Sequence, residues 1–140
     1  MATGTYKVDL STIWLFSSCS NKELNTIRRS LEAEMAKPGK VLVKQGDIGH
    51  EFYLIVAGMA SVKKNNRRVA TLGPSDYFGE LSLLDRQTRS ATVAAETDME
   101  LLILGQRQFN TILETVPSLS RKLLSIMATR LRESDAKAFQ

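Results

Sequence analysis

Hydrophobic positions change their spacing twice along the chain, and the two changes divide it into three regions. In the first region, apolar residues recur at helical spacing behind Ser20, which together with Glu23 has the pattern of a capping box. We therefore predict a helix over residues 21–31. A short amphipathic segment, residues 8–16, precedes this helix, and we expect its Trp14 to be a packing anchor.

The second region, from about residue 32 to residue 105, has short apolar runs bounded by turn-forming residues. We predict strands over residues 32–36, 40–44, 51–57, 59–64, 67–72, 89–95 and 99–104. Asn65-Asn66 stands between two of these runs and predicts a hairpin turn. About eight short strands at regular spacing indicate a mainly β fold that is closed or double-sheeted, such as a jelly roll.

In the third region the helical period returns. One predicted helix has apolar residues at i, i+3, i+4 and i+7, namely Phe109, Ile112, Leu113 and Val116, and Pro117 marks its end. A second helix, residues 118 to about 134, carries an apolar stripe among arginines and lysines. We expect the stripe to pack on the β fold, while the basic residues leave a membrane surface or a groove-binding helix as the alternative.

Composition narrows the class of protein. The length of 140 residues predicts one domain, and a hydrophobic content of 43% is sufficient for a folded core. The net charge of +4 suits an anionic ligand without demanding nucleic acid. The single cysteine, Cys19, excludes an internal disulfide and favours a reducing compartment. We find no signal peptide and no apolar run long enough to cross a bilayer, so we expect a cytoplasmic protein without a membrane span.

The candidate chemistry lies in residues 78–93, FGELSLLDRQTRSATV. We predict a short helix at its start, residues 80–84, whose first backbone N–H groups lack intrahelical partners and carry partial positive charge. Gly79 lets a ligand approach that backbone, and Arg89 supplies a planar fork of donors that matches a phosphate. A carboxylate repels phosphate, so we expect Glu80 to accept a hydrogen bond from a hydroxyl. A phosphate and a sugar hydroxyl together describe a nucleotide.

This stretch resembles the phosphate-binding cassette of the cyclic nucleotide-binding domain family, which reads roughly F-G-E-L-A-L-L, three variable residues, then P-R-[AST]-A-T-V. The matching residues are Phe78, Gly79, Glu80, Leu81, Leu83, Leu84, Arg89, Ala91, Thr92 and Val93. Ser82 stands at the usual alanine, and Thr88 stands at the usual proline, which leaves the loop less rigid. The resemblance covers about residues 16–130 and includes a glycine-containing turn at residues 46–49.

The resemblance implies a single domain over residues 1–140 with an eight-stranded β jelly-roll barrel over about residues 32–105. N-terminal helices, a short cassette helix and two C-terminal helices over about residues 106–135 would flank this barrel. A jelly roll is also what the strand pattern favours, so the pattern and the resemblance agree.

The resemblance also implies roles for individual residues. Arg89 would bind the cyclic phosphate, Glu80 the ribose 2′-hydroxyl, and Ser90 the phosphate or the purine. The remaining members of the expected ligand-binding set are Phe78, Gly79, Leu81, Ser82 and Ala91. The base would rest on apolar residues such as Val69, Leu72 and Val93, and the last helix would close the pocket with Arg130 or Leu131.

We therefore expect a sensor or regulatory domain that binds a cyclic nucleotide, cAMP or cGMP, without a further cofactor or a metal. Movement of the C-terminal helix would report occupancy to an effector protein or a fused effector domain. Ser90 alone does not choose the nucleotide, because family members of both preferences carry a hydroxyl after the arginine. We expect cAMP to bind at least as well as cGMP. The alternative is a fragment of a cAMP-responsive transcription factor without its DNA-binding module, so we expect no direct DNA binding.

Enzymatic functions lack the residues that they need. A metal-dependent jelly-roll enzyme of the cupin type requires several histidines with a carboxylate, and this chain has one histidine, His50. His50 adjoins a glycine turn, and we interpret it as a surface residue. No phosphate-binding loop of the Walker type is present in the sequence. We expect no catalytic residues.

Overall fold

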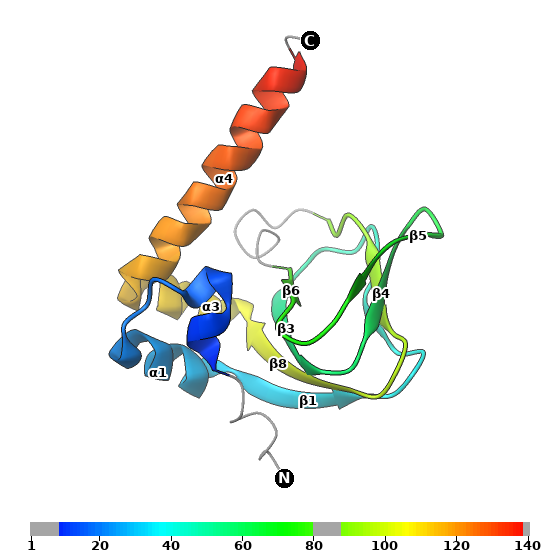
Figure 1. Ribbon diagram of the computed structural model, residues 1–140, viewed down its shortest axis with the longest axis horizontal. Coiled ribbons are helices and arrows are strands. Elements are labelled where there is room, and N and C mark those ends of the chain that lie inside the picture. Colours follow the sequence, from blue (N-terminus) through cyan, green and yellow to red (C-terminus); the bar gives the residue numbers. More distant parts are fainter. Residues whose placement is uncertain (1–8, 80–87, 139–140) are drawn as a thin grey trace.

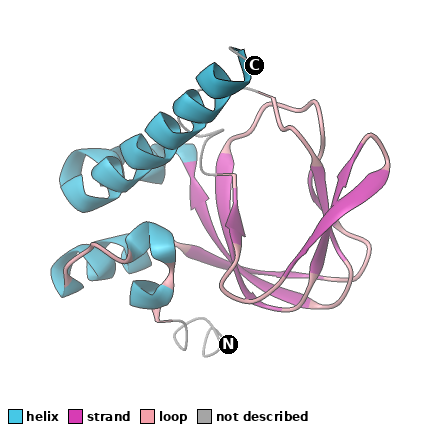
Figure 2. Ribbon diagram, turned by 45° about the horizontal axis from the view of Figure 1, so that its top comes forward, coloured by secondary structure: helices cyan, strands magenta, loops and turns pink. Residues whose placement is uncertain are grey.

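The computed structural model describes residues 9–79 and 88–138, which form a β region with helices from both ends of the chain along one side of it (Figure 1). The strands curve around a common interior (Figure 2). The short helix that we predict over residues 80–84 lies outside the described residues.

The described residues contain eight strands: β1 (Glu32–Ala36), β2 (Val41–Val43), β3 (Glu51–Ala57), β4 (Ala60–Lys64), β5 (Arg67–Leu72), β6 (Tyr77–Phe78), β7 (Thr92–Ala95) and β8 (Met99–Gly105). They form two antiparallel four-stranded sheets, in the orders β1-β8-β3-β6 and β2-β7-β4-β5. The predicted double-sheet β fold is therefore confirmed at this level. β6 is not predicted from the sequence, because a two-residue strand has no periodicity to detect.

β3 and β8 are buried on both faces, which explains why their sequences are nearly continuous apolar runs. On β3, Phe52 and Leu54 face the helices, whereas Tyr53 and Ile55 face the space between the sheets. Residues of β8 alternate in the same way against β3, with which β8 pairs in register. The molecule therefore has two hydrophobic cores that share one sheet as their wall.

The β4–β5 hairpin has the turn that its sequence predicts. Asn65 and Asn66 both adopt positive φ, 53° and 65°, as a tight two-residue turn requires. Gln45 holds this turn against the segment after β2, because its Oε1 accepts from the Asn65 N–H at 2.9 Å and its Nε2 donates to the Asn65 side chain at 3.0 Å.

The N-terminal segment forms two 3-10 turns, η2 (Leu10–Thr12) and η3 (Trp14–Phe16), followed by helix α1 (Asn21–Ser30). The predicted capping box is present: Ser20 Oγ accepts from the Glu23 N–H, and Glu23 Oε1 accepts from the Ser20 N–H. The expectation that Trp14 is a packing anchor is wrong. Its side chain is 50% exposed, and the neighbouring Leu15 and Phe16 fill the core instead.

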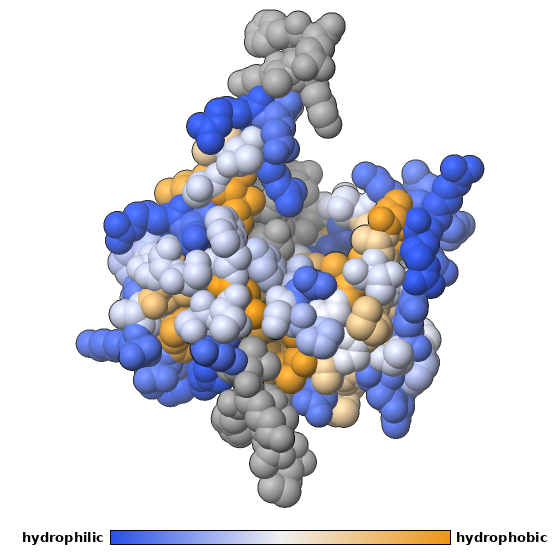
Figure 3. All heavy atoms as spheres, in the orientation of Figure 1, coloured by the Kyte–Doolittle hydropathy of each residue, from blue (hydrophilic) through white to orange (hydrophobic). Residues whose placement is uncertain are grey.

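Two helices end the described chain, α3 (Gln106–Thr115) and α4 (Pro117–Ala138). Pro117 begins α4 rather than only ending α3, because proline is well suited to the first turn of a helix. The apolar stripe of α4 packs as predicted at Leu119 and Leu123, but Met127 and Leu131 are exposed. From there α4 projects away from the β region, and Figure 3 shows apolar surface along it.

Candidate functional site

Arg89 is the centre of the candidate site. It lies just before β7 and is buried, with only 7% of its surface exposed. Its Nη2 donates to the carbonyl oxygen of Glu51 at 2.7 Å. Its backbone N–H donates to the carbonyl of Asp47 at 2.6 Å, and its own carbonyl accepts from the Gly46 N–H at 2.9 Å. The turn before β3 and the first residue of β3 therefore fix both ends of this arginine.

Gly79 is required by packing as well as by backbone conformation. Its φ is +92°, a region that side chains disfavour. A Cβ atom at this position would lie 2.6 Å from Arg89 Nη1 and 2.6 Å from the Glu51 carbonyl oxygen. The guanidinium of Arg89 therefore rests directly against the Gly79 backbone. The sequence does not predict this contact, because residues 79 and 89 are not neighbours in the chain.

Arg89 forms part of the wall of a cavity of about 320 Å³. The other residues that line it come from β2, β3 and the turn between them: Val41, Leu42, Val43, Lys44, Asp47, Ile48, His50, Glu51 and Tyr53. The wall thus combines apolar side chains with groups of both charges. His50 is exposed at this wall, as its turn position predicts.

Tyr53 and Glu51 support Arg89 from β3, where they lie on the same face. The Tyr53 hydroxyl donates a hydrogen bond to Glu51 Oε1 at 2.9 Å and lies 3.3 Å from the Leu42 carbonyl. Burial, and next the neighbouring Glu51, raise the pKa of the Tyr53 hydroxyl above its ordinary value. Neither residue was predicted from the sequence; the signal was their i, i+2 spacing in a strand that is otherwise apolar.

Phe78 belongs to β6, and its ring stacks on that of Tyr53 at 4.8 Å between centroids. The structure thus brings Phe78, Gly79 and Arg89 together around the start of β3. Ser90 is exposed and Ala91 is half-buried, directly after Arg89. Glu80, Leu81 and Ser82 lie outside the described residues, as do Leu83 and Leu84.

The residues expected to hold the base or close the pocket are more dispersed. Val93 is buried in the core between the sheets, Leu72 packs against that core, and Val69 is exposed on β5. Arg130 and Leu131 are exposed on the projecting part of α4. None of these five residues lines the cavity beside Arg89.

Across residues 9–79 and 88–138, no group of three or more histidine, cysteine, aspartate or glutamate side chains is placed to hold a metal ion. Within the same ranges, no helix combines the length and the apolar character needed to cross a bilayer.

Comparison with known proteins places the chain in a family. Residues 34–116 match the family described as "Cyclic nucleotide-binding domain". The chain is 35% identical over 117 residues to a cAMP-dependent protein kinase regulatory subunit of Hypocrea atroviridis, covering 84% of this chain and 25% of that protein. It is 32% identical over 126 residues to the Cyclic AMP receptor protein of Thermus thermophilus, covering 86% of this chain and 58% of that protein.

Solved structures agree with the sequence matches. The Thermus thermophilus Catabolite Activator Protein superposes with a TM-score of 0.78 at 32% identity, over 89% of this chain and 61% of the other. The regulatory domain of Toxoplasma gondii PKA, crystallised with cAMP, superposes with a TM-score of 0.74 at 26% identity, over 86% of this chain and 47% of the other. The chain thus spans between a quarter and about three fifths of the length of these relatives. The chain belongs to the cyclic nucleotide-binding domain family.

Proposed function

We propose that this domain binds a cyclic nucleotide, cAMP at least as well as cGMP, and acts as a sensor or regulatory domain. The observation that carries the proposal is the buried Arg89, held by the Glu51 carbonyl at 2.7 Å and resting on Gly79. The guanidinium presents a planar fork of N–H donors that matches the oxygens of a phosphate bidentately. Relatives named for cAMP, and the structure of a further relative with cAMP, support the choice of ligand.

In this proposal Arg89 binds the cyclic phosphate and Glu80 accepts from the ribose 2′-hydroxyl. Gly79, Leu81 and Ser82 contribute backbone N–H groups, and Ser90 donates to the phosphate or accepts from the 2-amino group of guanine. Such a neutral hydrogen bond is worth about 0.5–1.5 kcal/mol, or up to roughly tenfold in affinity. Both nucleotides should therefore bind.

Helix α4 is the proposed output element. The buried Leu119 and Leu123 fix its first turns. Its later turns expose apolar side chains, which would become covered if the helix moved to a second position. Ligand binding would shift the packing of Leu83 and Leu84, and α4 would move to cap the base with Arg130 or Leu131. The nucleotide would thus bias a two-state element by contacting both of its parts.

We propose no catalytic role. The alternative is that the domain is the ligand-binding piece of a cAMP-responsive transcription factor, favoured by its likeness to the longer Thermus thermophilus protein. Neither hypothesis expects this domain itself to bind DNA, and a mobility-shift titration at several salt concentrations tests that shared expectation: specific, salt-sensitive DNA binding would contradict it.

Calorimetric titration with cAMP, cGMP and 5′-AMP tests the proposal. The last compound has the base and sugar of cAMP but an open phosphate. We expect saturable binding of both cyclic nucleotides and at least about tenfold weaker binding of 5′-AMP. Failure of both cyclic nucleotides to bind would overturn the proposal, and a hundredfold preference for cGMP would overturn the assignment of cAMP.

A further inference from the structure

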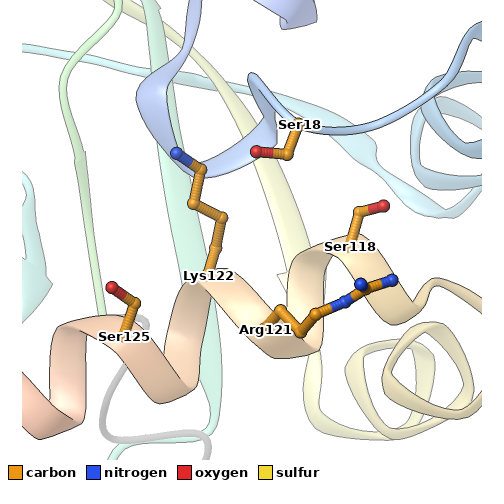
Figure 4. Close-up of a pocket in the computed structure, with 5 residues that line it drawn as sticks. All are labelled: Ser18, Ser118, Arg121, Lys122 and Ser125. Atoms are coloured by element: carbon orange, nitrogen blue, oxygen red, sulfur yellow. The ribbon is translucent and has the colours of Figure 1, made fainter.

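A second cavity, of about 310 Å³, lies away from Arg89, between the N-terminal segment and the start of α4 (Figure 4). It is lined by Ser18, Ser118, Arg121, Lys122 and Ser125. Four of these residues come from the first turns of α4, and Ser18 comes from the loop between η3 and α1. The volume falls in the range of small-molecule sites, about 300–1,000 Å³.

The lining has the chemistry of an anion site. It consists of three hydroxyls, one guanidinium and one ammonium, and no carboxylate is among the lining residues. Neither Arg121 nor Lys122 forms an ion pair with any residue that the structure describes. Arginine and lysine side chains with serine hydroxyls are the donor set that binds phosphate.

Lys122 is already held in position. Its side chain is half-buried, and its Nζ lies 4.0 Å from the centre of the Trp14 ring. Figure 4 shows it reaching from α4 toward the N-terminal segment, which also carries Ser18. A cation–π contact satisfies the charge only in part and leaves N–H donors of the ammonium free to turn toward a ligand. This contact also explains the exposed position of Trp14.

One carboxylate adjoins the cavity and bears on its charge. Glu23 Oε1 accepts from the Ser118 hydroxyl at 3.0 Å and from the Ser20 N–H at 2.8 Å. The hydrogen bond from the Ser20 backbone N–H contributes most to lowering the pKa of Glu23, so the Glu23 carboxylate stays charged. The Glu23 carboxylate faces the Ser118 and Ser20 donors. Its one negative charge is outweighed by the two positive charges of Arg121 and Lys122, so the net charge around the cavity is positive.

We propose that this cavity binds the phosphate group of a small soluble phosphate monoester, held by Arg121, Lys122 and the hydroxyls of Ser18 and Ser125. Because the cavity is bounded by α4 on one side and by the loop after η3 on the other, an occupant ties these two elements together. The site is separate from the cavity beside Arg89, so it stands whether or not that cavity binds a cyclic nucleotide.

Trp14 is the single tryptophan of the chain and therefore reports on Lys122 directly. We would titrate the protein with inorganic phosphate and with glycerol 3-phosphate, following Trp14 emission, and with sodium chloride at matched ionic strength. We expect a saturable change with both phosphates and none with chloride. The backbone amide signals of Ser18 and Ser118 should shift over the same concentration range.

Arg121→Gln should weaken the binding of glycerol 3-phosphate by at least about tenfold, the effect of losing one charge-assisted hydrogen bond. The matched control is Arg107→Gln, an exposed arginine on α3 that lowers the net charge equally and should leave binding unchanged. Arg89→Gln should also leave this response unchanged. An equal response to chloride, equal loss in the Arg107 control, or full affinity in Arg121→Gln overturns the site. Binding of inorganic phosphate but not of the ester overturns the assigned ligand class.

Discussion

At the scale of single residues, Gly79 and Arg89 are coupled by direct contact. The Arg89 guanidinium lies where a side chain at position 79 would begin, so any larger residue must displace it or the Glu51 carbonyl. Gly79→Ala should therefore lower the free energy of unfolding through both positive-φ strain and this clash. Strain alone costs about 1–3 kcal/mol. Urea unfolding of the variant measures the sum.

Gly39→Ala is the matched control for that experiment. Gly39 has nearly the same φ, +91°, but a Cβ there meets nothing within 4 Å. The Gly79 variant should lose more stability than the Gly39 variant, and it alone should lose affinity for cAMP. Equal losses of stability would mean that the contact between Gly79 and Arg89 adds nothing to the backbone strain.

The Tyr53 hydroxyl gives a second prediction at this scale. Its pKa is raised in the folded state above the ordinary value of 10.0, chiefly by burial and next by its hydrogen bond to Glu51. The folded protein thus holds this proton more tightly than the unfolded chain, so the stabilisation is complete below about pH 10 and is lost as pH rises above it. The steepest loss for one group is about 1.4 kcal/mol per pH unit.

Comparison of the wild-type protein with Tyr53→Phe isolates this effect from the titration of lysines. Between pH 8 and pH 11, urea unfolding should show a smaller loss of stability in Tyr53→Phe than in the wild type. At pH 8 the variant should itself be less stable by about 1 kcal/mol, because Glu51 loses a donor. Parallel pH profiles for the two proteins would show that Tyr53 does not titrate as its surroundings indicate.

At the scale of elements, the first turns of α4 have one buried face and one exposed face. Leu123 is 1% exposed, whereas the adjacent Leu124 is 63% exposed. Leu123→Ala should therefore cost about 2–5 kcal/mol of stability, and Leu124→Ala should stay within about 0.5 kcal/mol of the wild type. Thermal or urea unfolding of the two variants checks this directly. Similar losses at the two positions would contradict the described orientation of α4.

The proposed lid is the projecting part of α4, which carries Leu131. Leu131 is exposed in the structure, so Leu131→Ala should leave stability unchanged. If this part of α4 covers the base when a nucleotide is bound, the variant should release cAMP several-fold faster with little change in association rate. Leu124→Ala serves as the control. Unchanged release in a stopped-flow experiment would remove Leu131 from the lid.

At the scale of the whole molecule, periodicity and turn residues predicted the double-sheet β fold and the flanking helices. The strands with clear alternation, and the capping box at Ser20, lie where their patterns indicate. The exposed Trp14 and the short β6 were not predicted, because each depends on partners distant in the chain: Lys122 for Trp14 and β3 for β6. No local pattern reports such partners.

In the candidate site, too, local motif residues could be predicted from the sequence, whereas contacts with distant partners could not. The motif identified Phe78, Gly79 and Arg89, which do lie together. The motif does not include Glu51, whose carbonyl holds Arg89, or Tyr53, which bonds to Glu51. These contacts, and that of Arg89 with the Gly79 backbone, arise from the pairing of β3 with β6 and from the position of the 46–51 turn. Such contacts could not be predicted from the sequence, because only the fold brings these residues together.

The affinity of Arg89→Gln for cAMP tests the central claim most directly, with Arg107→Gln as the charge-matched control. Calorimetry on both variants, after their folding has been verified by urea unfolding, should show about a two- to four-decade loss for Arg89→Gln and none for the control. That loss corresponds to about 3–5 kcal/mol, the usual effect of removing one member of a buried charge pair. A folded Arg89→Gln protein that binds cAMP as tightly as the wild type would contradict the account.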